Sequence, residues 1–146
     1  MSTFNPDQFL NTETNDATST AYTPIPENEY TACVKEIKPR STNSGKAILD
    51  VVWSIDDADG SIEAATGMKQ ATVRQSIFLD ITESGGLDTG KGKNVQLGKV
   101  REALGQNTAG KVWRPGDLIG GVAKVQVKHR MDGDATYVDV KAVTKL

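Results

Sequence analysis

Apolar and polar residues alternate with a period of two over five stretches of the chain, which is the pattern of half-buried β-strands. These stretches are residues 29–38, 47–55, 71–81, 118–130 and 135–145. The second is the most regular, with Ala47, Leu49, Val51, Trp53 and Ile55 on one face. In the third, Val73, Ile77, Leu79 and Ile81 are expected to face inward, and Arg74, Ser76 and Phe78 outward.

A helical pattern occurs once with good length, over residues 94–104. Leu97, Val100 and Leu104 follow the spacing of a buried helical face, and Asn94 is expected to cap its start. Asn5 followed by Pro6 predicts a single helical turn near the N-terminus. The polar interval 56–70 is expected to be a connection.

The element order predicts the fold class. The Asp132–Gly133 pair favours a tight hairpin between the last two strands. Three strands, one helix and two more strands match a mostly β, OB-like five-stranded antiparallel barrel with its helix between strands three and four. Other α+β arrangements share this order. We expect an OB-like domain over residues 29–146, preceded by an acidic, Thr- and Asn-rich leader, extended and partly disordered, over residues 1–28.

Charge is distributed unevenly along the 146-residue chain, which has a net charge of −2. Residues 1–30 contain five acids and no Lys or Arg, so the remainder carries 17 basic and 14 acidic residues and a charge of +3. Such asymmetry is typical of a nucleic-acid partner, although a solvated acidic tail explains it equally well. Without a signal sequence, a long apolar run or a second cysteine, a cytoplasmic location and no membrane contact are expected.

A glycine-rich loop over residues 81–93 resembles a phosphate-binding loop, with Gly85, Gly90 and Lys91 in the G-x-x-x-x-G-K register. The next residue is Gly92, where such loops carry the Ser or Thr that binds magnesium. A true phosphate-binding loop also turns directly from a strand into a helix and belongs to a parallel sheet, and the sequence predicts neither feature here. We interpret it as a flexible connection whose Lys91 and Lys93 either are solvated or close over a nucleic-acid backbone.

Residues for catalysis or metal binding are scarce. The single histidine, His129, fits a surface position or a phosphate contact, and Cys33 lies in a strand without a neighbouring base. The acidic turn that begins at Asp56 lacks the glutamate of a calcium loop, because Gly67 occupies its twelfth position. No catalytic residue, cofactor or metal is predicted.

Binding to single strands requires a basic groove with aromatic platforms on which bases stack. In an OB barrel, the loops between strands one and two and between strands four and five line the cleft, and both are basic here. Trp53 and Phe78 fit core positions as well as stacking positions, and the basic loops fit a merely solubilising role. The predicted nucleic-acid-binding residues are Lys38, Arg40, Lys46, Trp53, Arg74, Phe78, Lys91, Lys93, Lys128, His129, Arg130 and Tyr137.

Five segments stand out along the chain, namely "FNPDQFLN", the Thr-rich leader, "IPENEYTACVKEI", "TNSGKAILDVVWSI" and "VKHRMDGDATYVDVKAV". Together they resemble a family of small phage proteins. Members of that family are single-stranded-DNA-binding or uncharacterised proteins found among replication and recombination functions. The resemblance covers most of the chain and is carried by turn glycines and strand alternation, including Gly45, Lys46 and Asp132–Gly133. It implies an OB-like fold and phage-genome maintenance, and nothing enzymatic.

The basic loops and exposed aromatics predict a non-enzymatic single-stranded-DNA-binding protein, and the resemblance implies that it supports phage DNA replication or recombination in the host cytoplasm. Many such proteins end in an acidic tail, whereas this chain ends "KAVTKL" and carries its acidic segment in residues 1–30. We expect the leader to recruit replication or recombination proteins or to compete with DNA, and homo-oligomers to form. The alternative is a phage structural or adaptor module that binds other proteins. A nucleotide hydrolase ranks third.

Overall fold

The computed structural model describes residues 3–18 and 23–146. Its strands are β1 (Asn28–Ser41), β2 (Ala47–Ile55), β3 (Thr72–Leu79), β4 (Val122–Asp132) and β5 (Ala135–Thr144). Its helices are α1 (Pro6–Phe9), α2 (Ser61–Thr66), α3 (Val95–Ala103) and the 3-10 helix η1 (Pro115–Leu118).

All five predicted strands form, and the pattern of alternation is visible in their burial. In β3, Val73 and Ile77 are buried and Arg74 and Phe78 are exposed, as predicted. The expectation for Ile81 is wrong. That residue is exposed, because it lies beyond the end of β3 and pairs only through an isolated bridge to Leu87.

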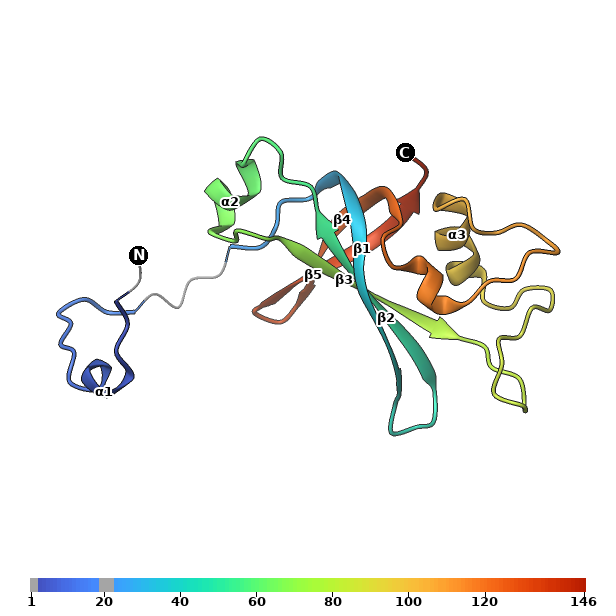
Figure 1. Cartoon of the computed structure of the whole chain (residues 1–146), viewed down its shortest axis with the longest axis horizontal. Coiled ribbons are helices and arrows are strands. Elements are labelled where there is room, and N and C mark those ends of the chain that lie inside the picture. The colour runs from blue at the N-terminus through green and yellow to red at the C-terminus, as the bar shows by residue number, and fades with distance from the viewer. Residues whose placement is uncertain (1–2, 19–22) are drawn as a thin grey trace.

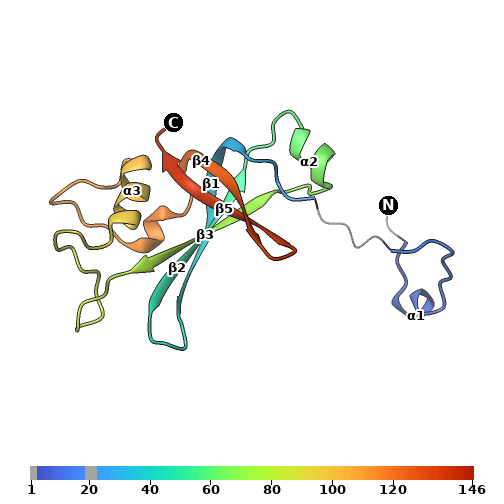
Figure 2. The same cartoon turned by 180° about the vertical axis from the view of Figure 1, so that it is seen from behind.

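The strands form one antiparallel sheet in the order β3-β2-β1-β4-β5 (Figures 1 and 2). The long strand β1 pairs with β4 through its first half and with β2 through its second, and its register shifts between Val34 and Glu36. Such a bulge bends a strand and increases its twist, which turns the two halves of the sheet toward each other. The edge strands β3 and β5 come close to each other, but no ladder of hydrogen bonds joins them, so the sheet is not closed.

The hydrophobic core lies inside the bend of the sheet and beneath α3. Trp53 of β2 and Ile77 of β3 are completely buried there, together with Leu97 and Val100 from α3. Because α3 contacts both β3 and β5, it covers the core at the point where the sheet is open.

Two local predictions about helices need correction. Asn94 stands at the position before α3, but its backbone is left-handed and its side chain makes no capping bond to the helix. Its amide instead exchanges hydrogen bonds with the Asp80 backbone, which ties the two ends of the glycine-rich loop together. The interval 56–70 is not only a connection, because it contains α2, whose first turn donates backbone hydrogen bonds to the Asp57 carboxylate.

The N-terminal turn forms as predicted, with the Asn5 side chain accepting bonds from the backbone of α1. The body of the protein begins before the predicted boundary at residue 28, since Ile25 is buried in the core. Glu27 accepts a hydrogen bond from the His129 backbone, which lowers the pKa of the Glu27 carboxyl from its ordinary value. Part of the predicted disordered leader, residues 19–22, lies outside the described residues.

Candidate nucleic-acid interface

One face of the strands β1, β2 and β3 points away from the core, and we call it the outer face. The strand register places its side chains in three rows across the sheet. The rows are Arg40–Ile48–Phe78, Lys38–Asp50–Ser76 and Glu36–Val52–Arg74. Four of the predicted binding residues, namely Lys38, Arg40, Arg74 and Phe78, therefore share a single surface.

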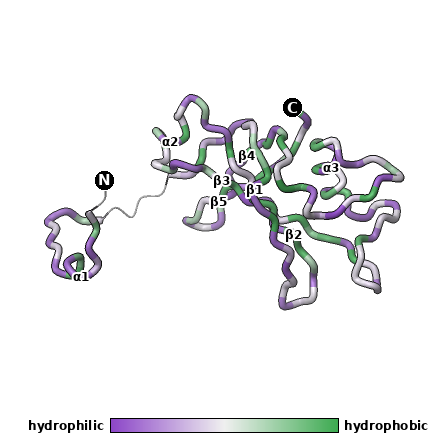
Figure 3. The backbone as a smooth tube through the Cα atoms, viewed as in Figure 1, coloured by the Kyte–Doolittle hydropathy of each residue, from purple (hydrophilic) through white to green (hydrophobic). Residues whose placement is uncertain are grey.

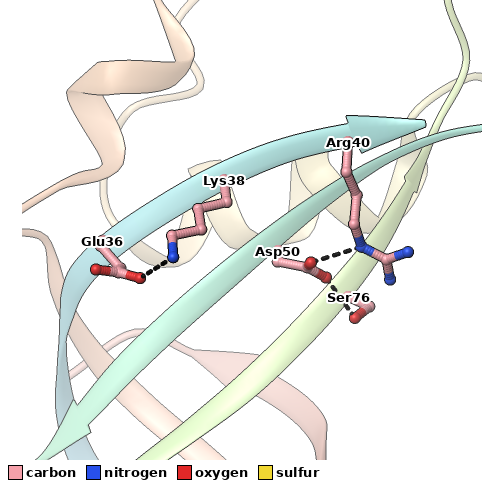
Figure 4. Close-up of polar contacts among 5 residues, drawn as sticks. All are labelled: Glu36, Lys38, Arg40, Asp50 and Ser76. Atoms are coloured by element: carbon pink, nitrogen blue, oxygen red, sulfur yellow. Dashed lines mark hydrogen bonds and ion pairs between the residues drawn. The ribbon is translucent and has the colours of Figure 1, made fainter.

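Asp50 occupies the centre of the outer face and organises the side chains around it (Figure 4). Its carboxylate accepts a hydrogen bond of 2.6 Å from Nε of Arg40 and another of 2.6 Å from the Ser76 hydroxyl. The two terminal nitrogens of Arg40 point away from Asp50 in Figure 4, so they remain available to a ligand. On the other side of Asp50 in Figure 4, the Lys38 ammonium lies 3.4 Å from a Glu36 carboxylate oxygen.

The Asp50 carboxyl stays ionised although it is mostly buried. Burial raises its pKa, but the hydrogen bonds from Arg40 and Ser76 and the charges of Arg40 and Arg74 outweigh that effect. The net result is a pKa below the ordinary value of 3.8. At neutral pH the outer face therefore contains a fixed negative charge that holds Arg40 in place.

Aromatic and cationic side chains meet at the end of the outer face that carries the β1–β2 hairpin. Phe78 is 59% exposed, and the Lys46 ammonium lies 5.9 Å from the centre of its ring. Figure 3 shows that the tip of this hairpin is largely hydrophilic. An exposed ring next to a lysine suits a nucleotide, because the ring can stack on the base while the ammonium contacts the phosphate.

A second group of predicted residues lies on the β4–β5 hairpin. The Arg130 guanidinium lies 4.6 Å from the centre of the Tyr137 ring, and its Nε donates a 2.8 Å hydrogen bond to Asp139. Asp139 raises the pKa of Arg130 from its ordinary value, through that bond and through its charge. The half-exposed Tyr137 ring therefore has a cation over it, and part of its surface is open to solvent.

A cleft of about 520 Å3 lies between these two groups and runs along the open edge of the sheet. Arg74 and Phe78 of β3 line one side, and Arg130 of β4 and Tyr137 of β5 line the other. The side chain of Arg74 makes no hydrogen bond or ion pair with the part of the chain that the structure describes, although its charge acts on the Asp50 carboxyl. The fold thus brings two arginines and two exposed aromatic rings from distant parts of the sequence into one cleft.

Other predicted residues are placed elsewhere. Trp53 is fully buried and donates its indole N–H to Gln75, so its ring is not available for stacking. The His129 ring is half-buried and donates one hydrogen bond to the Ile25 carbonyl, so one of its two nitrogens is engaged within the protein. Lys91 and Lys93 are exposed on the loop after β3, next to the Phe78 end of the outer face. Lys128 is half-buried on β4.

Some residues that shape this surface were not predicted from the sequence. Asp50, Asp139 and Ser76 position the arginines, yet single acids and serines in strands resemble ordinary solvent-facing residues. Their signal is the strand register, which sets Asp50 opposite Ser76 and Asp139 diagonal to Arg130. Sequence alternation assigns a face to each residue but gives no such register.

No protein-family model matches the chain, and a search of curated proteins finds no match to it. In the described ranges, 3–18 and 23–146, no three His, Cys, Asp or Glu side chains lie close enough together to hold a metal ion. Nor does any helix in those ranges have the length and apolar character needed to cross a membrane.

Proposed function

We propose that the protein binds single-stranded DNA through the outer face and the adjoining cleft, using an OB-like barrel that is open between β3 and β5. The main support for this proposal is that Arg74, Phe78, Arg130 and Tyr137 line one cleft. OB-type proteins bind oligonucleotides on the face of strands two and three and on the loops at either side of it. The sheet order and the contact of α3 with both edge strands support this assignment.

Phosphates and bases have separate partners in this proposal. Lys46, Arg74 and the free end of Arg40 hold phosphates, while Phe78 and Tyr137 stack on bases. The surface carries five basic side chains and three acidic ones, so the affinity of one protomer for DNA is modest. The basic residues are Lys38, Arg40, Lys46, Arg74 and Arg130, and the acidic residues are Glu36, Asp50 and Asp139. The resemblance to phage replication and recombination proteins supports the same reading, with host cytoplasm as the location and no enzymatic step.

The test is fluorescence anisotropy of a labelled oligothymidine, with a duplex control, at low and high salt. The wild-type protein should bind the single strand more tightly than the duplex, and its affinity for the single strand should fall as the salt concentration rises. Arg74→Ala with Lys46→Ala should flatten the plot of log affinity against log salt, by about 0.7 for each phosphate that no longer has a cation beside it. Phe78→Ala should weaken binding by about 1–3 kcal/mol without changing that slope.

A matched control removes the same charge elsewhere. Lys69→Ala with Lys111→Ala changes two exposed lysines that lie outside the three rows and do not line the cleft, and it should leave affinity and slope close to those of wild type. If the folded wild type fails to retain oligothymidine at low salt, the proposal is wrong. Equal effects of the two double variants would exclude the outer face as the binding surface.

The adaptor function is the second candidate, and α1 is the observation that favours it. Phe9 and Leu10 are exposed on a short helix that lies apart from the sheet (Figures 1 and 2). An adaptor would show no salt-sensitive retention of DNA and would bind another protein through this segment.

A further inference from the structure

An apolar groove of about 740 Å3 lies between α3 and the second half of β5, and we call it the α3–β5 groove. Val95, Ala103 and Val143 contribute apolar surface to it. Its charged lining residues are Lys99, Glu102, Lys141 and Lys145. The groove is therefore apolar at its base and carries a net positive charge.

The N-terminal segment also presents an exposed apolar surface. The rings of Phe4 and Phe9 contact each other with their centres 5.4 Å apart, and the neighbouring Leu10 is 84% exposed. We call Phe4, Phe9 and Leu10 the apolar knob. The Asn5 cap and Pro6 hold this turn in its helical form, so little conformational freedom is lost when the knob binds.

Charge as well as shape matches the knob to the groove. Residues 3–18 contain Asp7, Glu13 and Asp16 and no Lys or Arg, a net charge of −3. The groove contributes three lysines and one glutamate, a net charge of +2. We propose that the apolar knob of one copy of the protein docks into the α3–β5 groove of a second copy, with the acidic leader lying against the lysines.

The arrangement favours a second copy as the occupant. In both views of the fold α1 lies apart from the sheet, and none of its residues is buried (Figures 1 and 2). Because the knob and the groove are different surfaces, the contact is head-to-tail, and repeated contacts build rings or open chains.

The contact is small, so it is weak in free solution. One short turn buries less than the roughly 1,200 Å2 typical of stable interfaces. Copies that are held close together associate more effectively, because their local concentration is raised. Self-association of this kind does not depend on DNA binding, so its test contains no DNA.

The test is sedimentation velocity of the full chain over a wide concentration series. Wild type should show a sedimentation coefficient that rises with concentration. Phe9→Ser with Leu10→Ser, which removes the knob, and Lys99→Glu with Lys141→Glu, which reverses the groove charge, should each weaken self-association at least tenfold. All four residues are exposed, and circular dichroism verifies that the variants fold. The control Val112→Ser removes an exposed apolar side chain outside both surfaces and should behave as wild type.

Mixing the two double variants gives the decisive result. The knob variant retains an intact groove and the groove variant retains an intact knob, so the mixture should form heterodimers and stop there, while wild type continues to larger species. Wild type that stays monomeric at every concentration overturns the proposal, and would be the result if the knob docked on its own body. Loss of association in only one double variant, or no association in the mixture, also overturns it.

Discussion

Replacing Asp50 by Asn tests whether a buried charge holds the outer face together. The Asp50 side chain is only 7% exposed and accepts 2.6 Å hydrogen bonds from Arg40 and Ser76. Asparagine keeps the size of the side chain but removes its charge and turns one acceptor oxygen into a donor. At least one of the two donors then loses its partner.

The expected cost follows from these two hydrogen bonds. A hydrogen bond to a charged group contributes about 1.5–3 kcal/mol, and the Ser76 bond falls in that range. Arg40 is 48% exposed, so water screens its contribution to about 0.5 kcal/mol. We expect Asp50→Asn to lower the free energy of unfolding by about 2 kcal/mol. For a body of this length that corresponds to a drop in Tm of roughly 7 °C.

Urea and thermal denaturation followed by circular dichroism measure this loss. Asp139→Asn is the matched control, because Asp139 also pairs with an arginine but is 44% exposed, and its partner Arg130 is 57% exposed. Its expected cost is about 0–1 kcal/mol. If the two variants lose the same stability to within about 0.5 kcal/mol, the reasoning from burial is refuted.

The pH dependence supplies an independent check. The pKa of Asp50 in the folded protein lies below 3.8, so its stabilisation is fully present above that value and is lost as the pH falls through the folded pKa. The difference between wild type and Asp50→Asn should be constant from about pH 7 to pH 5 and should shrink below about pH 4. A difference that persists unchanged at about pH 2 would contradict an ionic role for Asp50.

Further predictions concern the core and two glycines. Trp53→Phe should cost about 1–3 kcal/mol in urea denaturation, because Gln75 loses the indole N–H that it accepts inside the core; unchanged stability would contradict this. Gly121→Ala should lower Tm, at a cost of about 1–3 kcal/mol, because a Cβ there would lie 2.7 Å from a Leu104 methyl group and 3.1 Å from the backbone oxygen of Leu118, so Leu104 must move and the backbone is crowded. Gly98→Ala should raise stability by about 0.5–1 kcal/mol, since it lies within α3 with open space around it; the same sign for both glycines would refute the packing argument.

Local patterns account for the strands. Alternation over residues 47–55 gave β2 with its observed limits, and it placed Arg74 and Phe78 outward on β3. Strand side chains point to opposite faces at every second residue, so this assignment needs no knowledge of the partner strands. The same rule predicts that Trp53 shares a face with apolar residues, and in the structure Trp53 is buried in the core and is not available for stacking.

Contacts between distant residues account for the failures. Asn94 is a residue type that often caps helices, but its side chain forms hydrogen bonds with the backbone of Asp80, fourteen residues earlier. The helix α2 is short, and its start depends on hydrogen bonds to Asp57, five and six residues away. Neither arrangement has a period that a sequence pattern detects.

The sequence by itself determined a mostly β chain, the face on which each strand residue lies and the acidic character of the N-terminal segment. Only the tertiary structure decided that Arg74 and Phe78 share a cleft with Arg130 and Tyr137, because the bend of the sheet brings together edge strands that do not pair. The same holds for Asp50, whose ionised state depends on donors from β1 and β3. Alternation is a property of one strand, whereas register and edge contact are set by the packing of the whole core.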